Sequence, residues 1–351
     1  MGMLIKEILD ADTLHTLTSN SDPKMIRDEQ VTAATMKFLK AIKQIELYPD
    51  HQALIDRFKP IQEKQPAIYA HRTSIIWKMS QAVFELMSLQ HSDADFLRSN
   101  VLKCQGSFLS VLFDDIGDLS HDKAVFEKCI LALNGQIDQS DVEFYTLVAE
   151  TWSTFQQGLK QAPNYAVLKP VLEDAFQTWI ASFKYSLLTE EELSQDENRW
   201  EKYVDIVPHT AMLYLAGLVD LLFVPNLSEQ QISVAAQIFL RSQTIVQIFN
   251  WLTTWSREVS QRDFSSGLFI LALENGWITQ DELKNGSSDE IKQKIRNSPA
   301  EKYLWDLYEK LCLEIHQVMD NIQLPGLQEY VGGISAIMYM CLASVQEFSN
   351  Y

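Results

Sequence analysis

The sequence predicts an all-α fold in a single domain. Apolar residues recur about every 3.6 positions, runs that alternate between apolar and polar residues are nearly absent, and only 12 Gly and 10 Pro interrupt the 351 residues. A content of 46% hydrophobic and 11% aromatic residues can form a substantial core. No linker, repeat or low-complexity tract divides the chain, so we expect one helical domain over 1–351, with segment 1–70 packing on it or capping it.

The net charge of −18 argues against nucleic acid or an anionic membrane as a partner, whereas a metal-chelated anion is not excluded. The four cysteines stand outside CxxC pairs and zinc-finger spacings, and no basic-then-apolar segment begins the chain, so we expect a reduced, cytoplasmic protein. The most apolar stretch, 211–224, is too short to span a bilayer, and we expect no membrane anchor. It contains Asp220, which is either a pocket-wall residue or, as we favour, a hydrogen-bonded core residue.

Helical spacing identifies several individual helices. The first strong pattern is carried by Trp77, Ala82, Val83, Leu86 and Met87, and a later one by Val234, Ile238, Ile245 and Ile248. Between them, an apolar helix over 108–113 leads into three aspartates, and 119–122 is expected to be a loop. Further turn-like clusters fall at 195–198, 225–228, 285–289 and 297–299.

Pro208 interrupts the segment 203–210. Inside a helix, a proline provides no N–H for the carbonyl of Val204, which would bend the helix and free that carbonyl to face a cation. Alternatively, Pro208 lies in the first turn of a new helix that is capped from Asp205.

The segment Asp114-Asp115-Ile116-Gly117-Asp118 predicts a magnesium site. On a helix, residues four apart lie on one face with β-carbons roughly 5–6 Å apart, so Asp114 and Asp118 can share cations while Asp115 points partly aside. Mg²⁺ is usually held by one or two carboxylates together with substrate phosphates. Carboxylates at a helix C-terminus are disfavoured by the macrodipole, which suggests a purpose other than helix stability. The alternative is a solvated helix end.

Asn250, Thr254 and Glu258 form a second candidate metal site, because positions i, i+4 and i+8 make one stripe of oxygen donors. Arg257 lies near the same face and can reach a phosphate oxygen. The alternative is a solvated polar face. The apolar neighbours weaken it, because they make this helix one that should be buried: Phe249, Trp251, Leu252 and Trp255.

These two motifs resemble those of class I terpene synthases, in which a DDxxD segment and a distal (N/D)Dxx(S/T)xxxE segment hold three Mg²⁺ ions around an isoprenoid diphosphate. The order and separation of the motifs match the family, and the resemblance covers roughly Trp77 to the C-terminus. Three departures stand out. Trp251 replaces the acidic second residue of the distal motif, Val207 stands where a diphosphate-sensing Arg is usual, and no Arg-Tyr pair lies near 348–351.

The resemblance implies a single-domain helical bundle of the class I isoprenoid synthase type and a terpene cyclase. It implies Mg²⁺, as three ions, held by Asp114, Asp115, Asp118, Asn250, Thr254 and Glu258, with Arg257 on the diphosphate. Farnesyl or geranylgeranyl diphosphate would be ionised and the carbocation cyclised to a hydrocarbon or alcohol. A homodimer is compatible with this family.

A carbocation is stabilised by aromatic faces, at about 0.5–2 kcal/mol for each contact. The candidates for the pocket wall are Phe108, Trp152, Phe155, Trp179, Phe183, Trp251 and Trp305, together with the carbonyl of Val204. Each of the aromatic residues can instead be ordinary core.

Two other functions compete with cyclisation. A chain-elongating prenyltransferase has a similar fold but uses two aspartate-rich motifs, and a head-to-head synthase uses paired DxxxD motifs; this chain has one aspartate-rich motif. From a different class, the chain can be a non-catalytic helical scaffold or binding protein that has lost its Arg donors.

Overall fold

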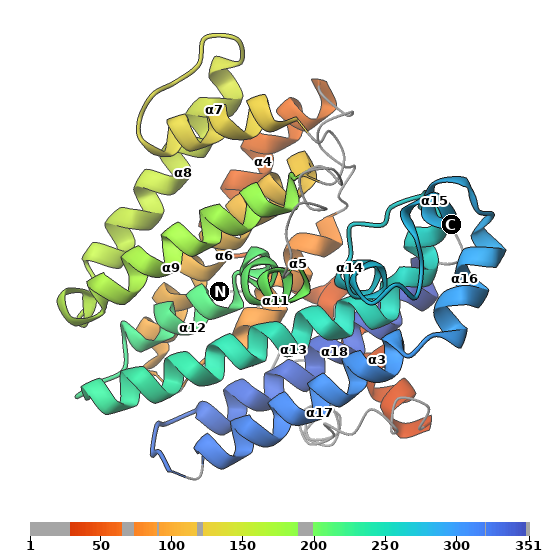
Figure 1. Ribbon diagram of the computed structural model, residues 1–351. Coiled ribbons are helices and arrows are strands. Elements are labelled where there is room, and N and C mark those ends of the chain that lie inside the picture. Colours follow the sequence, from red (N-terminus) through yellow and green to blue (C-terminus); the bar gives the residue numbers. More distant parts are fainter. Residues whose placement is uncertain are drawn as a thin grey trace.

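A computed structural model describes residues 29–64, 74–89, 91–117, 122–188, 199–319 and 321–348. Within these ranges the chain is helical and has no β-strand, which confirms the all-α prediction (Figure 1). The elements are α3 (Glu29–Gln44), α4 (Pro49–Lys64), α5 (Ser74–Leu86), α6 (Asp93–Asp115), α7 (Lys123–Leu133), α8 (Val142–Lys160), α9 (Tyr165–Ser186), α11 (Arg199–Ile206), η3 (Val207–Ala211), α12 (Leu213–Leu221), α13 (Glu229–Gln261), α14 (Gly267–Glu274), α15 (Gln280–Asn285), α16 (Ser288–Asn297), α17 (Ala300–Met319) and α18 (Leu327–Phe348).

The 33-residue helix α13 is the central element of the fold. It begins at a capping box, in which the Ser228 hydroxyl accepts a hydrogen bond from the Gln231 N–H and the Gln231 side chain accepts one from the Ser228 N–H. It packs against α12 on one side and against α17 and α18 on the other (Figure 1). Among the described helices, α13 alone is long and apolar enough by itself to cross a membrane, and 56% of its apolar window is buried inside the protein.

The predicted periodicities agree with the buried faces. Trp77, Ala82, Val83, Leu86 and Met87 are buried on and just after α5. On α13, Ile238, Ile245 and Ile248 are buried, and Val234 is partly buried against the core. The turn clusters at 225–228, 285–289 and 297–299 fall at helix boundaries, whereas 195–198 lies outside the described residues. Within the N-terminal segment, α3 packs on α5 and α18, and α4 packs on α6 and α8.

The chain breaks at Pro208 in the second of the two predicted ways. Pro208 lies in the first turn of the short 3-10 helix η3, but the residue at its N-cap is Ile206, whose side chain makes no capping hydrogen bond, so the expected cap from Asp205 is wrong. Met212 then adopts a left-handed conformation (φ 61°), and the axis bends by 58° between the α11–η3 pair and α12. This break directs one turn of the chain toward α6 and α13.

A buried ion pair joins α6 to α12. The Nζ of Lys103 lies 2.8 Å from Oδ1 of Asp220, and both side chains are almost completely excluded from solvent. Asp220 also accepts hydrogen bonds from the Ser99 hydroxyl (2.5 Å) and the Leu89 N–H (3.2 Å), and the His91 ring lies 3.3 Å away. Asp220 is therefore the hydrogen-bonded core carboxylate that the sequence favours.

We expect Lys103→Met to lower the free energy of unfolding by about 3–5 kcal/mol, because it leaves a buried carboxylate without its cation. Burial alone would raise the pKa of Asp220, but Lys103 and His91 hold that pKa below its ordinary value. The pair therefore stabilises the fold above the ordinary aspartate pKa, and this contribution is lost as the pH falls through the lowered value. Urea denaturation at pH 7 and at lower pH measures both effects.

The exposed Lys160, which belongs to no ion pair among the described residues, gives the matched control Lys160→Met. We expect this change to alter stability by less than about 0.5 kcal/mol. Equal stabilities of the two variants at pH 7 would contradict the proposed importance of the pair.

Candidate active site

The acidic segment lies where α6 ends. The α-helix stops at Asp115, and Ile116 and Gly117 continue in a wider turn. The side chain of Asp114 is partly exposed and lines a cavity, whereas Asp115 is 1% exposed and does not line it. Asp118 lies outside the described residues, so its predicted position one turn beyond Asp114 stays a prediction.

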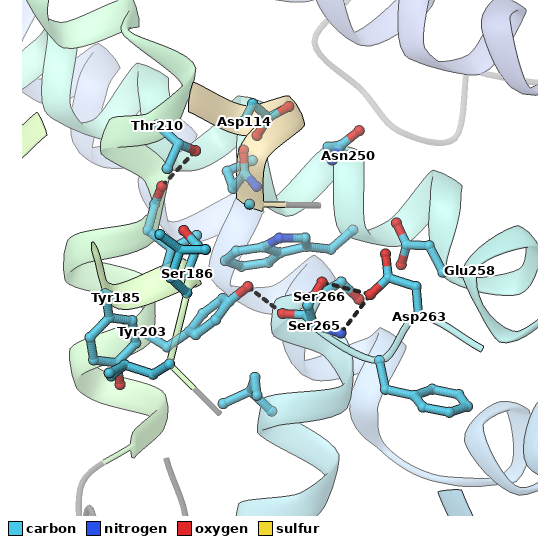
Figure 2. A pocket seen from close by; sticks show the side chains of 18 of the residues that line it. Asp114, Tyr185, Ser186, Tyr203, Thr210, Asn250, Glu258, Asp263, Ser265 and Ser266 are labelled. Atoms are coloured by element: carbon cyan, nitrogen blue, oxygen red, sulfur yellow. Dashed lines mark hydrogen bonds between the residues drawn. The ribbon is translucent and has the colours of Figure 1, made fainter. Parts of the chain in front are cut away.

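The second motif lies in the C-terminal half of α13. Asn250 and Glu258 line the same cavity as Asp114, although the two segments are far apart in sequence (Figure 2). Thr254 is buried between them, and its hydroxyl donates a hydrogen bond to the Asn250 carbonyl at 2.8 Å. Thr254 does not line the cavity, and Arg257 is exposed outside it. The structure thus brings Asp114, Asn250 and Glu258 together.

This cavity has a volume of about 710 Å³. Its wall is built by α6, the first residue of α7, α9, α11, η3, α13, the loop after α13, α14 and α15. In that loop, the Asp263 carboxylate accepts hydrogen bonds from the N–H (3.0 Å) and hydroxyl (2.7 Å) of Ser265. The Tyr203 hydroxyl donates to the Ser265 carbonyl at 2.6 Å and fixes the loop to α11 (Figure 2). The volume is in the range of small-molecule sites.

The surroundings of Glu258 disfavour the negative charge of its carboxylate. It is 8% exposed, and its Oε2 accepts no hydrogen bond from the described residues. Burial raises the pKa of Glu258 and the charge of Asp263 adds to this, while the hydroxyls of Thr254 and Ser266 and the charge of Arg257 act in the opposite direction. Negative charge at this end of the cavity is therefore under-compensated, and a bound cation would relieve it.

Arg199 is a cation in the cavity wall that the sequence analysis missed. Its Nε is buried and makes no hydrogen bond within the described ranges. Arg199, Tyr203 and Val207 are spaced four apart and all line the cavity, so the arginine lies two turns before Val207 on the same face. That spacing is the signal that could have identified it. Arg262 also lines the cavity, but its guanidinium donates to the carbonyls of Gly286 and Lys284.

Most of the predicted aromatic wall lies elsewhere. The residues that do not line the cavity are Phe108, Trp152, Phe155, Trp179, Phe183, Val204 and Trp305. The aromatic residues among them pack against other rings instead: Phe108 lies 5.3 Å from Trp77, and Trp179 lies 5.4 Å from Phe113 and 6.2 Å from Trp152, between ring centroids. Phe108, Phe155, Trp179 and Phe183 are buried, and Trp152, Val204 and Trp305 are partly buried against the core. Helical spacing could not distinguish the core from a cavity wall.

Trp251 is the predicted aromatic residue that does line the cavity. Its ring lies 5.6 Å from Tyr203 and 5.9 Å from Trp200, between centroids. Gly267, at the start of α14, packs directly on the indole, since a β-carbon there would lie 2.7 Å from it. The absence of a side chain at Gly267 therefore sets the position of Trp251.

The donors in the cavity suit a hard cation only in part. Within the described ranges, no group of three or more His, Cys, Asp or Glu could hold a metal ion. The oxygen donors that the two motifs bring to the cavity are the carboxylates of Asp114 and Glu258 and the amide of Asn250, and the Asp263 carboxylate, which already accepts hydrogen bonds from Ser265, also lines it. Mg²⁺ commonly takes one or two carboxylates and completes its shell with water and substrate phosphate, so this donor set fits magnesium together with an anionic ligand.

No family model matches the chain, and neither does any curated protein. Among solved structures, the chain is similar to the crystal structure of a linalool/nerolidol synthase from Streptomyces clavuligerus in complex with 2-fluorogeranyl diphosphate. The TM-score is 0.48 and the identity 13%, over 87% of this chain and 97% of that chain. At this distance, the functional evidence lies in the chain's own cavity residues.

We expect Gly267→Ala to destabilise the protein by about 1–3 kcal/mol, because the added methyl group must displace the Trp251 indole. Gly117→Ala is the matched control, since a β-carbon there meets no atom of the described residues within 4 Å, and its effect should be below about 0.5 kcal/mol. Urea denaturation measures both. A Gly267→Ala variant as stable as the parent protein would refute the close contact.

Proposed function

We propose that the chain is a class I terpene cyclase that ionises a linear isoprenyl diphosphate in this cavity. One observation carries the proposal: Asp114, Asn250 and Glu258, which come from the two motifs that resemble the family's metal-binding segments, line one cavity. A solvated helix end and an unrelated polar face would have no reason to meet in this way.

The roles follow from chemistry and position. Asp114, Asn250 and Glu258 supply oxygen ligands from the cavity wall. Asp115, Asp118 and Thr254 belong to the proposed metal-binding set through the motif resemblance alone, because Asp115 and Thr254 do not line the cavity and Asp118 lies outside the described residues. When bound, Mg²⁺ supplies Lewis-acid charge that stabilises the leaving diphosphate.

The organic part of the substrate needs apolar surface and exclusion of water. Trp251 offers an aromatic face to a carbocation, and Val111, Val207 and Ile270 contribute apolar surface to the same wall. We propose that the substrate is farnesyl or geranylgeranyl diphosphate and that the protein is cytoplasmic, where such soluble diphosphates are available to it.

Arg199 is the proposed diphosphate donor. Its guanidinium can donate several hydrogen bonds in a fixed plane and matches phosphate oxygens, and its buried Nε makes no hydrogen bond with the described residues. Arg199 would provide the positive charge that is missing because Val207 stands where a diphosphate-sensing arginine is usual. Arg257 is exposed outside the cavity, whereas Arg199 lines it.

The direct test is incubation with Mg²⁺ and geranyl, farnesyl or geranylgeranyl diphosphate, with released diphosphate quantified and extracts analysed by mass spectrometry. We expect Asp114→Ala and Asn250→Ala to lower the rate of diphosphate release by at least about 100-fold, because each removes a ligand that acts on the developing charge. Circular dichroism should show that both variants remain folded.

Exposed positions provide matched controls: Asp306→Ala on α17 and Asn321→Ala after it should keep the parent rate. If no diphosphate is released from any substrate, the non-catalytic scaffold becomes the better account. A longer isoprenyl diphosphate formed in the presence of isopentenyl diphosphate would instead favour the elongating transferase.

Arg199→Gln should raise the KM for the diphosphate substrate by about 10-fold to 100-fold, because a charge-assisted pair contributes about 1.5–3 kcal/mol. The control is Arg57→Gln, which removes an exposed pair with Glu150. An unchanged KM in Arg199→Gln, with the parent kcat, would exclude Arg199 from diphosphate binding.

A further inference from the structure

The cavity wall next to the proposed metal-binding residues is unexpectedly polar. On α6, Ser110 and Ser107 lie about one and two turns before Asp114, and all three line the cavity. On α13, Gln247 lies about one turn before Asn250 and also lines it. With the diphosphate held near Asp114 and Asn250, a hydrocarbon chain in the same cavity lies within reach of this wall.

The partners of these polar groups differ. Ser110 accepts a hydrogen bond from the Trp179 indole N–H at 3.0 Å, and the Thr210 hydroxyl donates to the Val207 carbonyl at 3.0 Å. Neither Ser107 nor Gln247 makes a side-chain hydrogen bond within the described part of the chain.

Gln243 provides an internal comparison for Gln247. It lies one turn earlier on α13, is 1% exposed, and accepts a hydrogen bond from the Tyr214 N–H at 3.0 Å. Its amide is therefore used to join α12 to α13. Gln247 lies on the same helix and lines the cavity, but its amide joins no two elements within the described part of the chain.

A hydrocarbon chain covering these groups would leave them without partners. An unpaired amide or hydroxyl that is removed from water loses its solvation, which destabilises the complex. A water molecule bound in the wall would satisfy them, because such a site needs two to four polar partners. Such partners are supplied by the side chains of Ser107 and Gln247 and by the Ser110 hydroxyl, which can still donate a hydrogen bond.

We infer that this wall holds the water that ends the reaction, so that the product is a terpene alcohol. The inference rests on the proposed function and specifies its product class. The allylic C–O bond breaks and the diphosphate leaves with both electrons. A lone pair of the water oxygen then forms the new C–O bond to the carbocation, and the proton released passes to the departing diphosphate.

The experiment is incubation of the full chain with Mg²⁺ and each of the three isoprenyl diphosphates in water enriched in ¹⁸O, followed by mass spectrometry of the organic extract. The expected product is an alcohol that carries ¹⁸O on carbon. Diphosphate release is measured in the same samples, so that ionisation is detected independently of the product.

Gln247→Leu and Ser107→Ala test the wall directly. Each removes one proposed partner of the water, so the ratio of alcohol to hydrocarbon should fall about threefold to tenfold while diphosphate is still released. Gln237→Leu is the matched control, because Gln237 is exposed on the same helix α13, and its product ratio should equal that of the parent chain.

The outcomes separate the two proposals. No diphosphate release from any substrate overturns the proposed function and this inference with it. Diphosphate release with hydrocarbon alone, or with an alcohol free of ¹⁸O, overturns the inference and leaves the proposed function standing. A labelled alcohol whose proportion is the same in the parent chain, Gln247→Leu and Ser107→Ala overturns the assignment of the water to this wall.

Discussion

The burial of α13 is the constraint on which the rest of the structure depends. This helix packs on α12, α17 and α18, and it also carries Asn250 and Glu258 on its cavity side. A carboxylate placed on a core helix loses most of its solvation, and Glu258 is only 8% exposed. The same packing that stabilises the fold therefore creates a site where negative charge needs a cation, and it positions that site opposite the end of α6.

The other half of the site depends on how α6 is held. Its Lys103 is paired with Asp220 of α12, and α12 follows the break at Pro208 that turns η3 toward the cavity. Gly217 of α12 packs against the ring of Phe239 on α13, which leaves no room for a β-carbon. These contacts connect α6, α12 and α13 into one unit, so Asp114 is positioned relative to α13 by the core itself.

Much of the fold and part of the site could be predicted from the sequence. Helix positions followed from the spacing of apolar residues, and the motif residues Asp114, Asn250 and Glu258 do line one cavity. The aromatic wall could not be predicted, because Phe108 and Trp179 have the same helical spacing whether they face a core or a cavity.

Other cavity residues depend on three-dimensional packing that the sequence does not encode locally. The four-residue spacing places Arg199 on the same helix face as Val207, but it does not show that this face meets a cavity. The amide of Gln243 is bonded because α12 lies beside it, whereas that of Gln247 makes no hydrogen bond within the described residues. The break at Pro208 was foreseen, but its two possible geometries could be separated only by the observed 3-10 turn. Whether a residue lines a cavity depends on how the helices pack against one another, whereas whether it is helical can be predicted from the spacing of nearby apolar residues.

The central claim is that the two motif segments form one site for a magnesium-bound diphosphate. The most direct test is the melting temperature of the full chain with Mg²⁺, with inorganic diphosphate, and with both. Binding to the native state alone stabilises a protein by about 2.7 kcal/mol at 100 times the dissociation constant, so we predict a rise of several degrees with both ligands and a much smaller rise with either one. No shift at millimolar concentrations of both ligands would contradict the account.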